Sequence, residues 1–326
     1  MIILSWDGLE LTRACVESLR RNTESELEVI VVDNGSRPEV QAAIPALADR
    51  SLLNPENRGF AIGMNQGLDL VDSPVVVFSN NDTVFPAGWD RLLLETLAGH
   101  SDAGLVVPAV TASGNPRTVR DRPGPEIERL LPFTEPPSGI VYLMRTETVR
   151  GLGGWSTDYP IASGEDWDLC FEIWTNGLEI YYDQRVLVEH VSKGTAAEKL
   201  GDWRTIWRAN RNLFLEKWST SPPAARMGES ALTARRQEEL RVVIEWMSRF
   251  YHTRDELLAS KDETAELERQ LRMLRKANAS LAEKASLSVQ LRAVPRRLRR
   301  KSRHLARRLL GSDAQQSQGP GDNTLE

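Results

Sequence analysis

Apolar runs alternate with helical stripes along residues 1–218. Nearly continuous runs of Ile, Val, Leu and Phe are typical of strands buried on both faces and predict strands at 1–5, 27–32, 52–53, 74–78, 105–107, 140–144, 178–182 and 186–188. Apolar positions spaced three and four apart predict helices at 9–21, 40–47, 61–70, 92–97, 165–174 and 203–218. Because strands and helices alternate with short connections, the sequence predicts an α/β fold built on a parallel sheet.

Two segments stand out from this alternation. Residues 111–137 are rich in Pro, Gly and Arg and show no period, so we expect a long loop of the kind that is functional or mobile. The helix at 203–218 is amphipathic, with one side formed by Trp203, Ile206, Trp207, Asn210, Leu213 and Phe214.

The chain changes character after residue 218. The run Ser219-Thr220-Ser221-Pro222-Pro223 marks a boundary, and nearly everything beyond it favours helix, including an apolar stripe at Leu240, Val243, Ile244, Met247 and Tyr251. From Leu257 to Ala285 a heptad frame places Asn278 at an a position, which fixes register in dimeric coiled coils. We expect an α/β domain at 1–218, a helical or coiled-coil extension at 219–290, a basic amphipathic helix at 291–310 and a disordered tail at 311–326. The extension forms a homodimer or packs back on the first domain, and both interpretations stay open.

Charge is distributed unevenly along the chain. Nine of the 41 basic residues lie between Arg292 and Arg308 with no acid among them, so the remaining 32 face 46 acids, a net charge of −14. Val294, Leu298, Leu305 and Leu309 form an apolar stripe beside these arginines. Such a helix is typical of attachment to an anionic membrane surface. A solvated face or nucleic-acid binding are the alternatives, but the leucine stripe favours the membrane, and no nucleic-acid partner is expected.

The two cysteines, Cys15 and Cys170, supply neither a disulfide framework nor a zinc-ligand spacing. Both lie in apolar surroundings, which fits core thiols in a reducing cytosol. No apolar run approaches the length of a membrane span, and Met1 already begins a strand rather than a leader sequence. We therefore expect a cytoplasmic protein, peripheral on the cytoplasmic face of the cell membrane if the basic tail binds there.

Polar residues follow two of the predicted strands. Asn80, Asn81 and Asp82 come after the run at 74–78, at the carboxyl edge of the sheet where open α/β folds bind ligands. Their oxygens suit Mg²⁺ or Mn²⁺ carrying a diphosphate, although Asn-Asn-Asp is also ordinary turn chemistry. Asp33, after the second strand, could accept from a pyrimidine N–H or a ribose hydroxyl, or simply cap the Asp-Asn-Gly-Ser turn.

Three further constellations carry candidate chemistry. Arg58 and Gly59 precede a helix whose free N–H groups form a natural anion site, whereas Gly63 and Gly67 suit helix–sheet packing. Glu165, Asp166 and Asp168 crowd a helix start, where the dipole favours acids and mutual repulsion raises a pKa toward that of a general base. His190 follows a strand and is either a structural hydrogen-bond donor or a second metal ligand facing Asp82.

Taken in order, these segments resemble family 2 glycosyltransferases of the GT-A fold, especially the rhamnosyltransferase-like branch. The resemblance covers about residues 1–218 and rests on the segments 2–8, 31–36, 57–67, 79–83, 153–155, 165–170 and 188–190, which read IILSWDG, VVDNGS, NRGFAIGMNQG, SNNDT, GGW, EDWDLC and VEH. It implies a mixed, mainly parallel sheet flanked by helices. It also implies direct inverting transfer of a sugar from a nucleotide-sugar donor to a hydroxyl of a glycan or lipid-linked acceptor.

The resemblance also assigns roles by position. Asp33 corresponds to the acid that reads the nucleobase, Asp82 to the last acid of the metal motif, and His190 to the histidine that completes the metal shell. Asp166 corresponds to the general base and Glu165 to a residue that orients the site, while Trp155 and Trp167 lie on the acceptor side. Three positions depart from the family pattern: Asp7, Asn80 and Glu172.

Two other classes remain as alternatives. A sugar-1-phosphate nucleotidyltransferase would share the sheet, but it usually has a Gly-rich basic loop after the first strand, where this chain has the acidic run Ser5-Trp6-Asp7-Gly8-Leu9-Glu10. A non-catalytic coiled-coil scaffold on a glycosyltransferase-like domain would not need Asp82, Glu165, Asp166 and His190 together.

Overall fold

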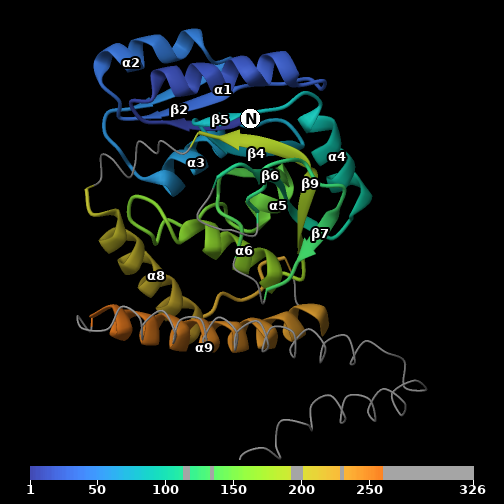
Figure 1. Cartoon of the computed structure of the whole chain (residues 1–326), viewed down its shortest axis with the longest axis vertical. Helices are drawn as coiled ribbons and strands as arrows, with labels where there is room; N and C mark the ends of the chain where they lie inside the picture. Colours follow the sequence, from blue (N-terminus) through green and yellow to red (C-terminus); the bar gives the residue numbers. More distant parts are fainter. Residues whose placement is uncertain (113–117, 133–135, 192–200, 228–230, 260–326) are drawn as a thin grey trace, which may run out of the picture. The chain divides into compact units, whose positions relative to one another are not determined.

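The computed structural model describes residues 1–112, 118–132, 136–191, 201–227 and 231–259. Met1–Thr253 form one compact unit, to which the following description applies. In the described part of this unit nine strands form a mixed sheet, in the order β3-β2-β1-β4-β8-β6-β9-β5, with β7 also paired to β9 (Figure 1). The heptad frame beyond residue 259 and the basic tail lie outside the described residues.

Half of the sheet is parallel. β1 (Ile2–Ser5) lies between β2 (Ile30–Asn34) and β4 (Val75–Asn80), and β3 (Arg50–Asn54) extends the sheet beyond β2. In register, Ser5 faces Asp33 and Leu4 faces Asn80. The carboxyl ends of these strands therefore meet at one edge of the sheet, which is where open α/β folds place their ligands.

The other half of the sheet mixes directions. β8 (Val141–Arg145) runs antiparallel to both β4 and β6 (Ala103–Val110), and β9 (Glu179–His190) runs parallel to β6. β5 (Thr83–Val84) and β7 (Ile127–Leu130) pair antiparallel with β9. A mixed, mainly parallel sheet flanked by helices is the GT-A architecture implied by the sequence, and this expectation is confirmed.

A separate hydrophobic cluster covers each face of the sheet. Ile2 belongs to one cluster and Ile3 to the other, because successive side chains of a strand point to opposite faces. The cluster around Ile3 is closed by α1 (Leu9–Asn22), η1 (Ile44–Ala46) and α4 (Trp89–Gly99), with α2 (Pro38–Ala43) leading into η1. The cluster around Ile2 is closed by α3 (Phe60–Asp69), α5 (Thr146–Gly151), α6 (Glu165–Thr175), α8 (Trp203–Thr220) and α9 (Ala231–Ala259).

The apolar stripe of α9 is part of this second cluster. Its five predicted members are all buried: Leu240, Val243, Ile244, Met247 and Tyr251. On α8 the Arg211 guanidinium lies 4.8 Å from the ring centroid of Tyr251, so the two helices pack side by side (Figure 1). The compact unit consequently extends through Thr253, past the boundary run at 219–223.

Three predicted elements differ from those observed. The expected loop at 111–137 contains β7, which pairs with β9 along its whole length. The expected strands at 178–182 and 186–188 are one strand, because a bulge lets β9 continue past an irregular segment. On α8, Leu213 is 41% exposed whereas Arg211 is buried, so the inward face is rotated from the predicted one.

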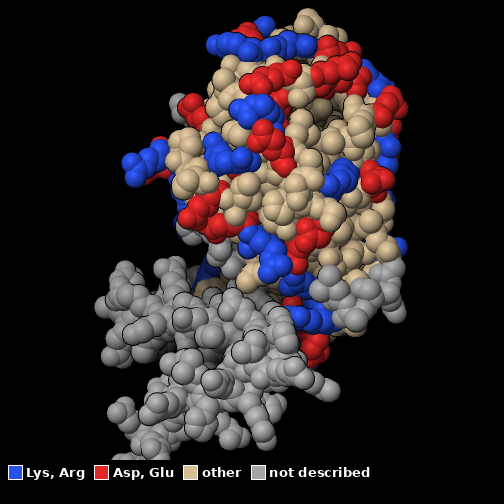
Figure 2. All heavy atoms as spheres, turned by 90° about the vertical axis from the view of Figure 1, so that its right-hand side faces the viewer, with Lys and Arg blue, Asp and Glu red and all other residues tan. Residues whose placement is uncertain are grey.

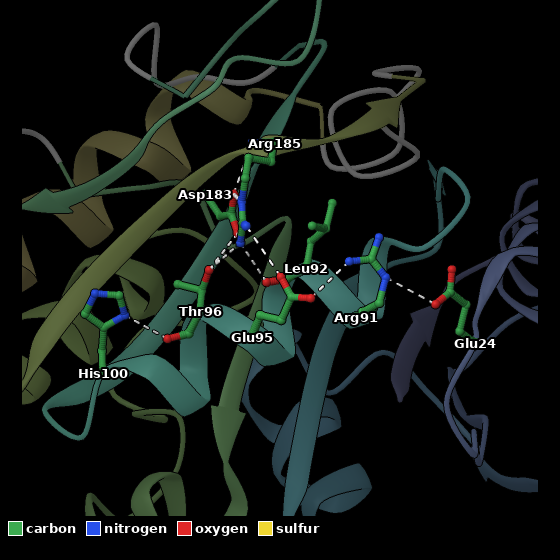
Figure 3. Close-up of polar contacts among 8 residues, drawn as sticks. All are labelled: Glu24, Arg91, Leu92, Glu95, Thr96, His100, Asp183 and Arg185. Carbon is green, nitrogen blue, oxygen red and sulfur yellow. Dashed lines mark hydrogen bonds and ion pairs between the residues drawn. The ribbon is translucent and has the colours of Figure 1, made fainter.

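The bulge in β9 is held by an ion pair between the buried Asp183 and the partly exposed Arg185. Across it the partner of Pro108 is Asp183, and the partner of the next residue is already Leu187. Asp183 is fully buried and accepts from the Thr96 hydroxyl at 2.7 Å and from the Arg185 guanidinium at 2.8 Å (Figure 3). These contacts fix the course of the strand that ends at His190.

On the face drawn in Figure 2, basic and acidic side chains are interspersed without a large patch of one sign. Arg91 and Glu95, one turn apart on α4, form one of the described ion pairs at 3.0 Å (Figure 3). Among the described helices, none is both long and apolar enough to cross a bilayer.

Candidate functional site

Asp82 and His190 face one another at the carboxyl edge of β4. Asp82 follows β4 by two residues and is 7% exposed. The short strand β5 pairs Thr83 with His190, and the Val191 N–H donates to the Asp82 carbonyl at 2.9 Å. As a result the His190 Nε2 lies 3.2 Å from Asp82 Oδ1. The predicted pair is therefore brought together.

The geometry of this pair fits a divalent cation. His190 Nδ1 lies 2.7 Å from the Ala112 carbonyl, to which it must donate, so Nε2 of the neutral ring presents a lone pair to a carboxylate oxygen. Two acceptors at that distance call for a proton or a metal between them. Adjacent ligands of an octahedral ion with bonds of about 2.1 Å lie about 3 Å apart. Burial lowers the pKa of His190, but the Asp82 carboxylate and the Ala112 carbonyl outweigh it and leave that pKa raised.

Only part of a coordination shell comes from the protein. The described residues contain no group of three or more His, Cys, Asp or Glu side chains able to hold a metal. Asn81 turns away, since its Nδ2 donates to Thr12 Oγ1 at 3.0 Å and fastens the turn to α1. Asn80 contributes to the sheet, with its N–H donating to the Ile140 carbonyl at 3.0 Å. The remaining ligands of a hard cation would be waters and oxygens of a bound molecule.

Asp166 reaches the same edge from the first turn of α6. Its Oδ2 accepts from the Gly139 N–H at 3.3 Å, and its Oδ1 from the Trp167 N–H at 2.9 Å. Gly139 directly precedes Ile140, whose carbonyl is bonded to Asn80 at the end of β4. Two adjacent residues therefore connect the Asp166 carboxylate to the strand end that leads to Asp82.

Burial gives Glu165 and Asp166 unusual acidities. Burial and, next, the Asp166 carboxylate raise the pKa of Glu165 to about 8, and its Oε2 has no hydrogen-bond partner among the described residues. Burial also raises the pKa of Asp166, against hydrogen bonds from the backbone of Trp167, Gly139 and Gly164. A pKa of about 8 keeps a proton on Glu165 near neutral pH, and the pKa of Asp166 is raised in the same direction.

Asp33 is used within its own turn. The carboxylate is fully buried and accepts from the N–H and hydroxyl of Ser36 and from Gln41 Nε2. The Asp7 N–H donates to the Ser36 hydroxyl at 2.7 Å, and the Asp7 side chain accepts from the Arg37 N–H. Turn capping, the alternative interpretation of Asp33, is thus what the contacts show.

The segment around Arg58 and Gly59 is tied to β2. Asn34 Oδ1 accepts from the Arg58 N–H at 3.0 Å, and the Arg58 side chain is exposed. Gly59 has φ 89°, and a Cβ there would meet the backbone of Ile161. The first N–H of α3, from Phe60, donates to the Ile161 carbonyl at 2.6 Å, so this part of the expected anion site is occupied by the protein itself. Gly63 and Gly67 pack against Leu4 and Ile2, which confirms helix–sheet packing.

The two tryptophans expected on the acceptor side lie in the core. Trp155 is 1% exposed and stacks on Tyr142, with ring centroids 5.5 Å apart. Trp167 is 8% exposed and packs edge-on against Phe214 of α8. Neither ring presents a free face, so a direct acceptor contact by either is a prediction that their burial does not favour.

The segment 160–164 was not singled out by the sequence. Ile161 and Ser163 have φ 71° and 80°, followed by Gly164 at 100°, directly before Glu165. A β-branched residue in this region is a true outlier, and such strain costs on the order of 1 kcal/mol or more for each residue. Asn210 of α8 contacts this segment, and its place on the apolar side of a predicted helix was the available signal.

Comparison with known proteins places these features in a family. The model of glycosyl transferase family 2 matches residues 2–149, a range that includes Asp33, Arg58 and Asp82 but ends before Asp166 and His190. A pre-mycofactocin glycosyltransferase of Mycobacterium tuberculosis is 30% identical over 210 residues. That match covers 59% of this chain and 41% of the relative, so the chain spans less than half of that protein.

Solved structures share the fold at low sequence identity. The mannosyltransferase PcManGT of Pyrobaculum calidifontis, in complex with GDP-Man and Mn²⁺, has a TM-score of 0.55 at 17% identity, covering 88% of this chain and 86% of that one. Residues 1–349 of S. aureus TarS have a TM-score of 0.54 at 15% identity, covering 83% and 77%. Residues 2–149 of this chain therefore match glycosyl transferase family 2, and the described fold is the GT-A fold.

Proposed function

We propose that the chain transfers a sugar, with inversion, from a nucleotide-diphosphate donor to a hydroxyl of a glycan or lipid-linked glycan acceptor. The observation that carries this proposal is the meeting of two groups of residues at the carboxyl edge of β4. Asp82 and His190 lie close enough together to ligate one divalent cation. Asp166 reaches the same edge through its contact with Gly139, which precedes Ile140. The family match over 2–149 supports the reaction class.

Asp166 is the proposed general base. It would remove the acceptor hydroxyl proton, so that the oxygen attacks the anomeric carbon opposite the leaving diphosphate without a covalent enzyme intermediate. Glu165, whose pKa of about 8 keeps it protonated at neutral pH, can donate a hydrogen bond and orient the site. In this proposal Asp166 accepts the proton, whereas Glu165 stays protonated.

The donor side involves the cation pair and two turns. Asp82 and His190 would hold Mg²⁺ or Mn²⁺, which when bound stabilises charge on the diphosphate. Arg58, which is exposed beside the start of α3, would contact a phosphate. The buried Asp33 shapes the 33–36 turn, where the nucleobase is expected. The complex of PcManGT with GDP-Man and Mn²⁺ supports a donor of this class.

Donor hydrolysis tests the proposal without knowledge of the acceptor. Purified protein is incubated with GDP-mannose and a panel of UDP- and dTDP-sugars, with Mn²⁺, Mg²⁺ or EDTA, and nucleoside diphosphate release is measured. We expect release from at least one donor, dependent on metal and lowered in Asp82→Ala. No release from any donor contradicts the proposal. Pyrophosphate formation from a nucleoside triphosphate and a sugar 1-phosphate would instead support the nucleotidyltransferase.

A further inference from the structure

Three successive carbonyls before Glu165 are held by other elements. Asn210 Nδ2 donates to the carbonyls of Pro160 and Ala162, both at 2.9 Å. The carbonyl between them, from Ile161, accepts from the Phe60 N–H at 2.6 Å. Asn210 is 2% exposed, and a side-chain amide can donate two hydrogen bonds from one nitrogen, which a carboxylate cannot. α8 and the start of α3 thus both donate hydrogen bonds to the segment 160–162.

The N–H groups that follow these carbonyls act on the carboxyls of Glu165 and Asp166, called here the acid pair. The backbone N–H of Ser163 acts to lower the pKa of Glu165, and that of Gly164 acts to lower the pKa of Asp166. Both donors belong to residues with positive φ, a backbone that a released chain would leave. The bonds to Pro160 and Ala162 therefore help to keep the donors of Ser163 and Gly164 in place.

α8 also holds the chain on the far side of the acid pair. Asp168 is buried and accepts from Lys217 Nζ at 2.8 Å and from Trp218 Nε1 at 2.7 Å. Glu165 and Asp166 consequently lie between two attachment points of one helix. That helix lies outside the segment matched by the family model.

We propose that Asn210 is a positioning residue for Glu165 and Asp166, acting through the carbonyls of Pro160 and Ala162. The inference rests on the proposed function, because Asn210 would position the Asp166 carboxylate, which is the proposed general base. It assigns α8 a direct part in the geometry of the active site, in addition to its packing.

The test compares two buried asparagines. Asn210 of α8 contacts the segment before α6, and Asn176 directly follows α6. Asn210→Asp keeps the shape but removes the two donated bonds. The control is Asn176→Asp, because Asn176 is buried, donates to the Glu172 carbonyl at 2.8 Å and accepts from the Met227 N–H at 2.7 Å. For a donor that the wild type hydrolyses, kcat and KM are measured together with Tm and hydrogen exchange of the peptide 159–166.

We expect Asn210→Asp to lower kcat by about ten- to a hundredfold with little change in donor KM, and to speed exchange in 159–166. Asn176→Asp should lower Tm while leaving kcat and this exchange unchanged. Asn210→Gln keeps the amide and should retain part of the wild-type kcat, which can be measured even if Asn210→Asp does not fold. An unchanged kcat in Asn210→Asp, or an equal loss of kcat in the control, overturns the inference. If the wild type releases nucleotide from no donor, the proposed function fails, and exchange alone decides whether Asn210 holds the segment.

Discussion

At the residue scale, two adjacent carboxyls acquire different properties from small differences in surroundings. Within the described part of the chain, the buried Glu165 Oε2 has no hydrogen-bond partner, and the pKa of Glu165 rises to about 8. Burial raises the pKa of Asp166 as well, although hydrogen bonds from the N–H groups of Trp167 and Gly139 favour its charged form. Because a neutral neighbour does not repel a carboxylate, a proton held on Glu165 favours ionisation of Asp166, which its proposed role as general base requires.

Asp166→Asn should remove the base without touching the donor side. We expect kcat for transfer or donor hydrolysis to fall at least a hundredfold, the usual lower size of a general-base effect, while donor binding stays near the wild-type value. Steady-state kinetics and nucleotide titration measure the two quantities separately. Turnover above about a hundredth of wild type would assign the base elsewhere.

Glu165→Gln should make the protein less sensitive to alkaline pH. The pKa of Glu165 is raised from 4.5 to about 8 on folding, so its contribution to the free energy of unfolding is complete below about pH 4.5 and is lost as pH rises to 8. Each pKa unit corresponds to about 1.4 kcal/mol, and Gln removes this loss. Melting curves from pH 5 to 8 should show the variant gaining on the wild type.

The control for that titration is Glu172→Gln. Burial raises the pKa of Glu172 to about 7, so its gain should have the same sign and level off about one unit lower. A Glu165→Gln difference that is flat with pH would mean that Glu165 is charged in the folded protein.

The sequence predicted residue types at this scale better than their contacts. Asp82 and His190 were singled out because each follows a predicted strand, and the resemblance paired them as metal ligands; the structure brings them to 3.2 Å. Trp155 and Trp167 were placed at the acceptor by resemblance, yet both rings are buried, and burial depends on tertiary packing that spacing does not encode. The positive φ of Ile161 likewise has no local sequence signal.

At the element scale, α9 completes the core of the compact unit. Its five buried apolar side chains lie in the same cluster as α6 and α8. Burial of one large apolar side chain is worth about 1.5–3 kcal/mol. Five together approach the entire stability of an ordinary domain, about 5–15 kcal/mol. A chain that stops before α9 would expose this part of the core.

Truncation should therefore show whether the folded unit ends at the boundary run 219–223 or at Thr253. We expect residues 1–253 to fold with a Tm close to that of the full chain, and residues 1–218 to aggregate or melt without cooperativity. Thermal unfolding followed by circular dichroism compares the two. Equal cooperative melting of both would place α9 outside the unit.

Point substitutions on α9 provide a matched control for the truncation. Ile244 is 2% exposed, and Ile244→Ala should cost about 2–5 kcal/mol. Val242 is 46% exposed, and Val242→Ala should change stability by less than about 0.5 kcal/mol. Similar losses at the two positions would contradict the packing of this face.

Long elements with a strong period were predicted well, and short or irregular ones were missed. β5 has two residues and β7 has four, and both exist because β9 offers them a partner rather than because of their own patterns. The sequence predicted a break in β9 because Asp183 and Arg185 interrupt the apolar run, whereas in the fold Arg185 pairs with the buried Asp183 and the strand continues.

At the scale of the whole molecule, charge is separated along the sequence. The described body shows both signs interspersed on the face of Figure 2, while nine basic residues without an acid gather between 292 and 308. This segment lies outside the described residues, and its amphipathic pattern stays a prediction. The same is true of the heptad frame with Asn278, for which light scattering on the full chain would reveal a dimer.

The basic segment is predicted to attach the protein to anionic lipid. Each of its arginines and its lysine contributes on the order of 1 kcal/mol near such a surface, and the leucine stripe adds apolar insertion that contact with phosphates alone does not use. Full-length protein should sediment with phosphatidylserine-containing vesicles at low salt and be released at high salt, whereas neutral vesicles should leave it in solution. A chain ending at Gln290 should lose binding, and equal sedimentation of both chains would show that the segment is not the anchor. Preferential binding to duplex DNA over vesicles at matched salt would favour the nucleic-acid alternative, because that contact uses the arginines without the leucines.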